Sequence, residues 1–148
     1  MLLAAGADTN IQDKKSRTVL HLAVDQRDGS LIDALLAAGA DTNIQDNAGR
    51  TVLHLAVDQR DGSLIEALLD AGADGNIKDK EGRTALHLAV KQSDGSLIDA
   101  LLDAGADMTI QDEEGRTALH LAAASFRRTN MEGYVPVSKG MRARLNVP

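Results

Sequence analysis

A period of 33 residues runs through most of this chain and constrains its fold more than any other feature. Residues 10–42 and 43–75 differ at only six of 33 positions. A set of histidines marks the same period: His21, His54, His87 and His120. Repeats of this length form solenoids, because a single unit cannot bury its own apolar surface and must pack against its neighbours.

The period divides the 148-residue chain into complete units with a partial unit at each end. The pattern indicates the end of a unit over 1–9, complete units over 10–42, 43–75 and 76–108, and the first half of a fourth unit over 109–124. The stretch 125–148 keeps no trace of the repeat. We therefore expect the sequence to start within a unit.

Each complete unit predicts two short helices joined by a turn. In the second unit, Thr51 is a suitable N-cap for a first helix over about 52–60. Ser63 and Glu66 match a capping box that would open the second helix, and the other two units carry the same box. Gly72 would end that helix, because glycine adopts the left-handed conformation most easily.

The unit resembles the ankyrin repeat. The segments GRTVLHLAV, GRTALHLAV and LLDAGADGNIKDKEG, together with the 33-residue length, carry the resemblance over about residues 1–124. It implies a mainly α solenoid of stacked antiparallel helix pairs with hairpin-like loops. It also implies a non-catalytic scaffold that binds other proteins, which is the usual role of this family.

Departures from the family pattern affect the local geometry. The proline usual after the motif threonine is replaced by valine or alanine. In the second unit Arg60 replaces the glycine usual between the helices, and we expect Gly62 to supply the lost flexibility. Ser16 replaces a hairpin glycine of the later units. The residues corresponding to Arg60 and Gly62 are Arg27 and Gly29 in the first unit, and Ser93 and Gly95 in the third.

Composition and spacing argue against a chemical site. The chain has no cysteine, which excludes thiolate metal sites and a cysteine nucleophile and fits a reducing compartment. The histidines of neighbouring units cannot share a zinc ion, because packed helices lie about 8–10 Å apart and zinc ligands lie about 2 Å from the metal. The resemblance implies instead that each histidine bonds to the threonine of its own motif. We expect no catalytic residues, no metal and no cofactor.

Charge argues against nucleic acid and membranes as partners. Residues 1–124 hold 11 Lys/Arg against 21 Asp/Glu, whereas duplex nucleic acid selects a basic face. No apolar run approaches the roughly 18 residues that span a bilayer. We expect a monomer that binds another protein and no small-molecule substrate. The expected location is inside the cell, in the cytoplasm first and with the nucleus as an alternative.

Specificity would reside where otherwise similar units differ. In the family, partners usually contact the hairpin tips and the exposed end of the first helix. Carried over, the candidate partner-binding residues are the tip residues Lys14, Lys15, Asn47, Ala48, Lys80, Glu81, Glu113 and Glu114, the first-helix residues Asp25, Gln26, Asp58, Gln59, Lys91 and Gln92, and the adjoining row Arg17, Arg50, Arg83 and Arg116. The tips run from positive to negative charge, which predicts a polar strip that orients a partner. The alternatives are neutral drift at the tips and a structural role for the arginines.

Two questions stay open at the level of sequence. The basic stretch 125–148 is either a diverged cap, with Phe126, Met131, Tyr134 and Val135 over the third unit, or an unrelated, disordered tail, which we favour after about Gly133. The alternative function is that of an inert solenoid segment of a larger enzyme, channel or ubiquitin-ligase adaptor whose activity lies elsewhere. A recently duplicated or designed array without an evolved partner is a third possibility.

Overall fold

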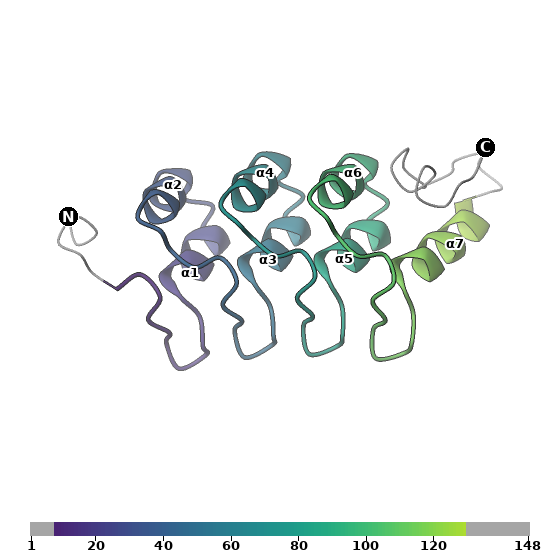
Figure 1. The fold of residues 1–148 in the computed structure, drawn as a ribbon, viewed down its shortest axis with the longest axis horizontal. Coiled ribbons are helices and arrows are strands. Elements are labelled where there is room, and N and C mark those ends of the chain that lie inside the picture. The colour runs from purple at the N-terminus through teal and green to yellow at the C-terminus, as the bar shows by residue number, and fades with distance from the viewer. Residues whose placement is uncertain (1–7, 130–148) are drawn as a thin grey trace.

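The helices alternate between two parallel rows (Figure 1). The computed structural model describes residues 8–129, with side chains through residue 124. Over that range the helices are α1 (Val19–Asp25), α2 (Gly29–Ala37), α3 (Val52–Asp58), α4 (Gly62–Asp70), α5 (Ala85–Lys91), α6 (Gly95–Asp103) and α7 (Ala118–Thr129). We call α1, α3, α5 and α7 the inner helices, and α2, α4 and α6 the outer helices. This mainly α solenoid of stacked helix pairs confirms the predicted fold class.

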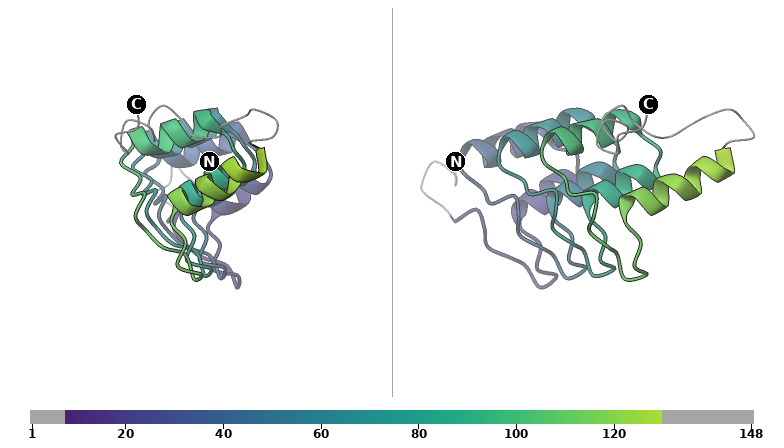
Figure 2. Two further views of the ribbon diagram at one scale, coloured as in Figure 1. Left: turned by 90° about the vertical axis from the view of Figure 1, so that its right-hand side faces the viewer. Right: turned by 45° about the vertical axis from the view of Figure 1, so that its right-hand side comes forward.

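Long loops project from the helices on one side and lie next to one another (Figures 1 and 2). We call them the first to fourth hairpins, over residues 8–17, 41–50, 74–83 and 107–116. Backbone hydrogen bonds of 3.0 Å join each tip amide to a tip carbonyl of the preceding hairpin, in the pairs Asn47–Lys15, Lys80–Ala48 and Glu113–Glu81. The hairpins therefore stack in the same register as the helices.

Each inner helix begins at its motif threonine because threonine and histidine cap it together. The Thr51 hydroxyl accepts a hydrogen bond from the His54 amide at 3.5 Å, and the Thr51 amide donates to His54 Nδ1 at 3.1 Å. This is a capping box in which histidine takes the place of the usual acidic residue. The first and third units repeat it. The predicted N-cap at Thr51 and the predicted threonine–histidine bond are both confirmed.

The outer helices begin at aspartate, and the predicted serine capping boxes were wrong. The Asp61 side chain accepts from the Leu64 amide at 3.1 Å and caps α4. Ser63 lies inside the first turn of α4, two residues after the cap. Asp28 and Asp94 occupy the same cap position in the other two units. Aspartate and serine are both good caps, so the turn that precedes the helix decides between them.

That turn passes through a left-handed residue that is not glycine. Arg60 has φ 56°, and its counterparts Arg27 and Ser93 have the same value. Gly62 is the first residue of α4, so the expectation that it replaces the missing turn glycine was wrong. A left-handed conformation costs a non-glycine residue about 1–2 kcal/mol. The turn keeps its shape because the Asp61 amide reaches back to the Ala56 carbonyl at 3.3 Å, as it does after a helix-ending glycine.

The core is aliphatic and is shared between neighbouring units. Leu53 and Leu86 of the inner helices are fully buried, as are Ile65 and Ile98 of the outer helices. The inner helices pack in series, α1 against α3, α3 against α5 and α5 against α7. Burial in one unit therefore depends on the units on either side, which is the basis of solenoid stability.

The inner row continues past the end of the repeat pattern. The sequence places the end of the fourth half-unit at residue 124, but α7 runs on to Thr129. The first residues of the basic stretch are thus helical, which moves this boundary. The proposed cap residues Met131, Tyr134 and Val135 lie outside the described residues. No helix of the described part is both long and apolar enough to cross a membrane.

Candidate partner-binding surface

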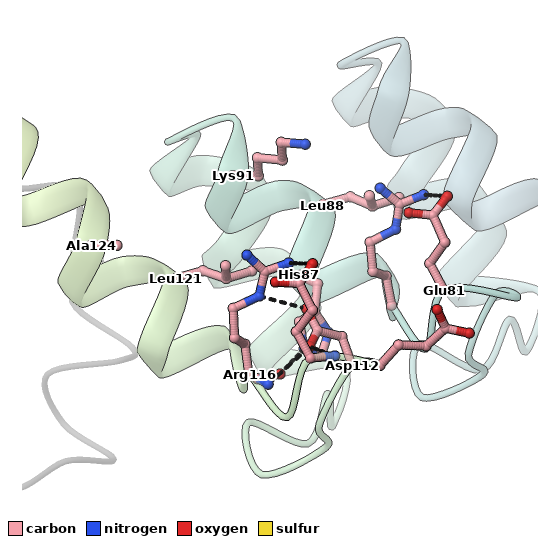
Figure 3. Close-up of a pocket in the computed structure, with 11 residues that line it drawn as sticks. Glu81, His87, Leu88, Lys91, Asp112, Arg116, Leu121 and Ala124 are labelled. Atoms are coloured by element: carbon pink, nitrogen blue, oxygen red, sulfur yellow. Dashed lines mark hydrogen bonds and ion pairs between the residues drawn. The ribbon is translucent and has the colours of Figure 1, made fainter.

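The candidate residues lie at the tips of the hairpins, at the ends of the hairpins next to the inner helices, and at the ends of α1, α3 and α5. Asp25, Asp58 and Lys91 are the last residues of α1, α3 and α5. A groove of about 730 Å³ opens between the third and fourth hairpins and the helices α5 and α7 (Figure 3). We call it the inner groove, and it is lined by Glu81, Arg83, His87, Leu88, Lys91, Asp112, Glu113, Glu114, Arg116, Leu121 and Ala124.

The inner groove combines an apolar floor with charges of both signs. Leu88 and Leu121 project from α5 and α7 in the middle of the view in Figure 3, with Lys91 on one side and Asp112 and Arg116 on the other. A neighbouring hollow of about 350 Å³ shares Leu88 and Lys91 and reaches back over the second unit to Arg50, Asp58 and Arg60. The sequence did not identify Leu88, Leu121 or Arg60 as candidate binding residues. Their only signal was a place next to the candidate positions in the repeat.

In the first two units, an arginine bridges the hairpin to the inner helix. Arg17 lies 3.3 Å from Asp13 in its hairpin and 3.9 Å from Asp25 of α1. Arg50 forms an ion pair with Asp58 of α3. The hairpin and the inner helix are therefore tied together at these two positions.

In the third and fourth units, the arginines turn back onto their own hairpins. Arg83 lies 3.1 Å from Asp79 and 3.2 Å from Glu81. Arg116 pairs in the same way, at 3.0 Å from Asp112 and 3.3 Å from Glu114. The helix position that is aspartate in the first two units is Lys91 in the third, so it cannot accept the Arg83 guanidinium.

The carboxylate of Asp112 is stabilised in its charged form by hydrogen bonds within the fourth hairpin. Burial alone would raise the pKa of Asp112, but hydrogen bonds from the Arg116 backbone and guanidinium and from the Glu114 amide lower it below its ordinary value of 3.8. The Asp112 carboxylate is thus charged at neutral pH and fixes both the turn and the arginine. The arginines of the row each pair with an aspartate of their own unit, as the structural interpretation of the row predicts.

Ion pairing also reduces the charge gradient predicted for the tips. Glu81 and Glu114 are partly neutralised by the arginines of their own hairpins. Lys14, Lys15 and Glu113 are exposed, and no ion pair joins them to another residue of the range 8–124. A partner would therefore meet fewer unpaired charges at the tips than the sequence suggests. The gradient still runs from positive at the first tip to negative at the last.

One glutamine of the candidate set is a link between units. The Gln59 Nε2 group donates to the Val24 carbonyl at the end of α1, at 2.8 Å. Gln59 thus connects α3 to α1 and is half-buried, whereas Gln26 in the first unit is exposed. The sequence could not distinguish these two residues, because their local context is identical.

No group of three or more His, Asp or Glu residues is placed to hold a metal ion within residues 8–124. Three of the motif histidines are buried and engaged in capping and in bonds to the next unit. What the groove can do is receive side chains of another molecule on leucine, next to fixed charges.

Comparison with known proteins agrees with the geometry. A family model for ankyrin repeats, in three copies, matches residues 1–79 and 59–132. No curated protein matches the sequence significantly. The matched ranges contain all seven described helices and all four hairpins. The chain therefore belongs to the ankyrin repeat family, whose members are generally protein–protein interaction modules.

Proposed function

We propose that this chain binds a segment of another protein in the inner groove, with Lys91 at one side of the contact. The observation that carries the proposal is the change of ion pairing at the third unit. In the first two units the arginine–aspartate pairs Arg17–Asp25 and Arg50–Asp58 join hairpin to helix. In the third unit Lys91 is exposed and Arg83 is held within the hairpin. The half-buried Leu121 lines the groove there, next to the buried Leu88.

The lining of the groove supports a partner of defined chemistry. Lys91 favours an acidic side chain, and Glu113 on the far hairpin favours a basic one. Leu88 and Leu121 favour a small apolar group between these two charges. The partner segment would thus carry an acidic, an apolar and a basic residue, in that order across the groove.

The expected affinity is modest and depends on salt. Residues 1–124 contain no aromatic side chain, so the Tyr and Trp anchors that dominate many tight interfaces are missing. Exposed charges direct orientation and association rate more than they add affinity, and added salt screens them. We propose a non-catalytic role inside the cell, for which the absence of cysteine gives support.

Replacing Lys91 by aspartate tests the proposal with little risk to the fold, because aspartate already occupies this position in the first two units. The immobilised chain and its variant K91D are used to capture proteins from a cell lysate, and the captured proteins are identified by mass spectrometry. The matched control is D70K, a charge reversal of the same size on the exposed end of the outer helix α4.

The proposal predicts that proteins captured by the unmodified chain and by D70K are lost, or reduced several-fold, with K91D. Capture of the same proteins in the same amounts by K91D would show that the inner groove is not the binding surface. Loss with D70K alone would place the surface on the outer helices.

A further inference from the structure

Two hydrogen bonds recur between successive units. Within the described residues, the groups at either end of the stack that would form these bonds with a further unit have no such partner. The Nδ1 atom of His54 accepts from the Thr51 amide, so its Nε2 carries the proton and donates to a carbonyl of the next unit. The donor–acceptor pairs, at 2.9–3.0 Å, are His21–Arg50, His54–Arg83 and His87–Arg116. Tip amides and tip carbonyls form the second recurring bond.

At the α7 end, the motif histidine that would donate to a further unit is exposed. His120 caps α7 through Thr117, like the other motif histidines. It is nevertheless exposed, and its Nε2 meets no acceptor among the described residues. Leu119 beside it is 37 % exposed, whereas its counterpart Leu86 is fully buried by the next unit. The carbonyl of Glu114 likewise receives no tip amide within the described part.

At the α1 end, the carbonyl that would accept a bond from the histidine of a preceding unit lacks that bond. The Arg50 carbonyl accepts from both the Asp46 amide and His21, whereas the Arg17 carbonyl accepts from the Asp13 amide alone within the described range. The apolar surface next to it is open as well. Val19 is 44 % exposed although its counterpart Val52 is 1 % exposed, and Ile11 is 66 % exposed.

We infer that two copies of this chain associate head to tail, with the α7 end of one copy on the α1 end of the other. In this arrangement His120 of one copy donates to the Arg17 carbonyl of the second copy, as His87 donates to Arg116 within the chain. The Lys14 amide of the second copy meets the Glu114 carbonyl of the first. Leu119 is then covered by Val19 and Ile11.

The charges at the two ends favour this pairing over the alternatives. The first tip carries Lys14 and Lys15, and the last carries Glu113 and Glu114. Head-to-tail stacking brings the lysines against the glutamates. Pairing of two identical ends would instead place like charges together, which is unfavourable.

Such a contact joins different surfaces of the two copies, so a pair of copies keeps one unused end of each kind and the contact can continue from copy to copy. We thus replace the monomer expected from the sequence by a concentration-dependent series of oligomers. The contact uses Glu113 and Glu114, which also line the inner groove, but the inference does not rest on the proposed function, because no partner molecule takes part.

A charge-swap experiment tests the inference. The unmodified chain is examined by sedimentation velocity over a range of concentrations and salt. Two variants are compared with it: one carries K14E and K15E and has acidic tips at both ends, and the other carries E113K and E114K and has basic tips at both ends. Circular dichroism establishes that both are folded, which is expected since all four side chains are exposed.

The inference predicts that the unmodified chain associates and that salt weakens the association. Each variant alone should remain largely monomeric, and an equimolar mixture of the two should associate again. An unmodified chain that is monomeric at every concentration would overturn the inference. So would association that both variants retain in full, since the contact would then lie elsewhere.

Discussion

At the scale of single residues, the motif histidine has two structural roles. Through Nδ1 it accepts from the threonine that caps its own helix, and through Nε2 it donates to a carbonyl of the next unit, as His54 does to Arg83 at 3.0 Å. The first role could be expected from the ankyrin-like motif. The second could not, because the carbonyl lies 29 residues away in sequence and becomes a neighbour only when the units stack.

The bond that His54 accepts at Nδ1 requires the neutral imidazole, which predicts that acid destabilises the fold. Burial lowers the pKa of His54 below its ordinary value of 6.5, and the Arg83 carbonyl and the Asp79 carboxylate oppose this shift only in part. The unfolded chain therefore binds the proton more readily, so the free energy of unfolding should decrease as the pH falls below about 6.5. Urea unfolding at a series of pH values measures this decrease.

The variant H54Q separates this contribution from the carboxylates. It should be less stable at neutral pH and should show a shallower loss of stability between about pH 6.5 and the onset of acid unfolding. An unchanged pH slope in H54Q would mean that His54 does not contribute to the acid sensitivity.

A pair of hairpin glycines allows backbone strain to be separated from contact between units. Gly82 and Gly115 both have φ 77°, so alanine is strained at either position. A Cβ at Gly82 would lie 2.8 Å from the backbone nitrogen of Glu113, whereas one at Gly115 would meet nothing within 4 Å. G82A should therefore cost about 1–3 kcal/mol more than G115A. Equal losses in urea unfolding would argue against the close stacking of the third and fourth hairpins.

At the scale of elements, the start of the outer helices shows how far local sequence signals reach. The sequence contains two good caps in each unit, Asp61 and Ser63 in the second, and the serine box was the wrong choice. Asp61 is the cap because the turn before the helix is left-handed at Arg60. Residue preferences do not predict this turn, since arginine is poorly suited to that conformation. The ends of the outer helices were predicted correctly, because Gly72 is a specific signal and has φ 94°.

Removing each cap candidate in turn tests this assignment. D61A loses the bond to the Leu64 amide and should lower the free energy of unfolding by about 1 kcal/mol. S63A should have no effect or stabilise slightly, because alanine is the better helix former inside the first turn. Thermal or urea unfolding of the two variants measures the difference, and the reverse order of stability would restore the serine box.

At the scale of the whole molecule, the stack was predictable and the groove was not. The period, the two helices and the hairpins follow from a pattern repeated along the chain. The charges that line the groove depend on how the ion pairs of a unit change when one of its residues differs from the other units. Lys91 leaves Arg83 without a carboxylate on the inner helix, and Glu81 and Asp79 receive it. Which carboxylates the guanidinium contacts depends on their distances in the folded chain. The sequence could therefore identify these residues but not their ion pairs.

The central claim is that a protein partner occupies the inner groove at the third and fourth units. Amide hydrogen exchange on the chain, with and without a captured partner, tests it most directly. The partner should slow exchange in the third and fourth hairpins and along α5 and the start of α7, and should leave the outer helices α2, α4 and α6 unchanged. Protection confined to the outer helices would contradict the claim.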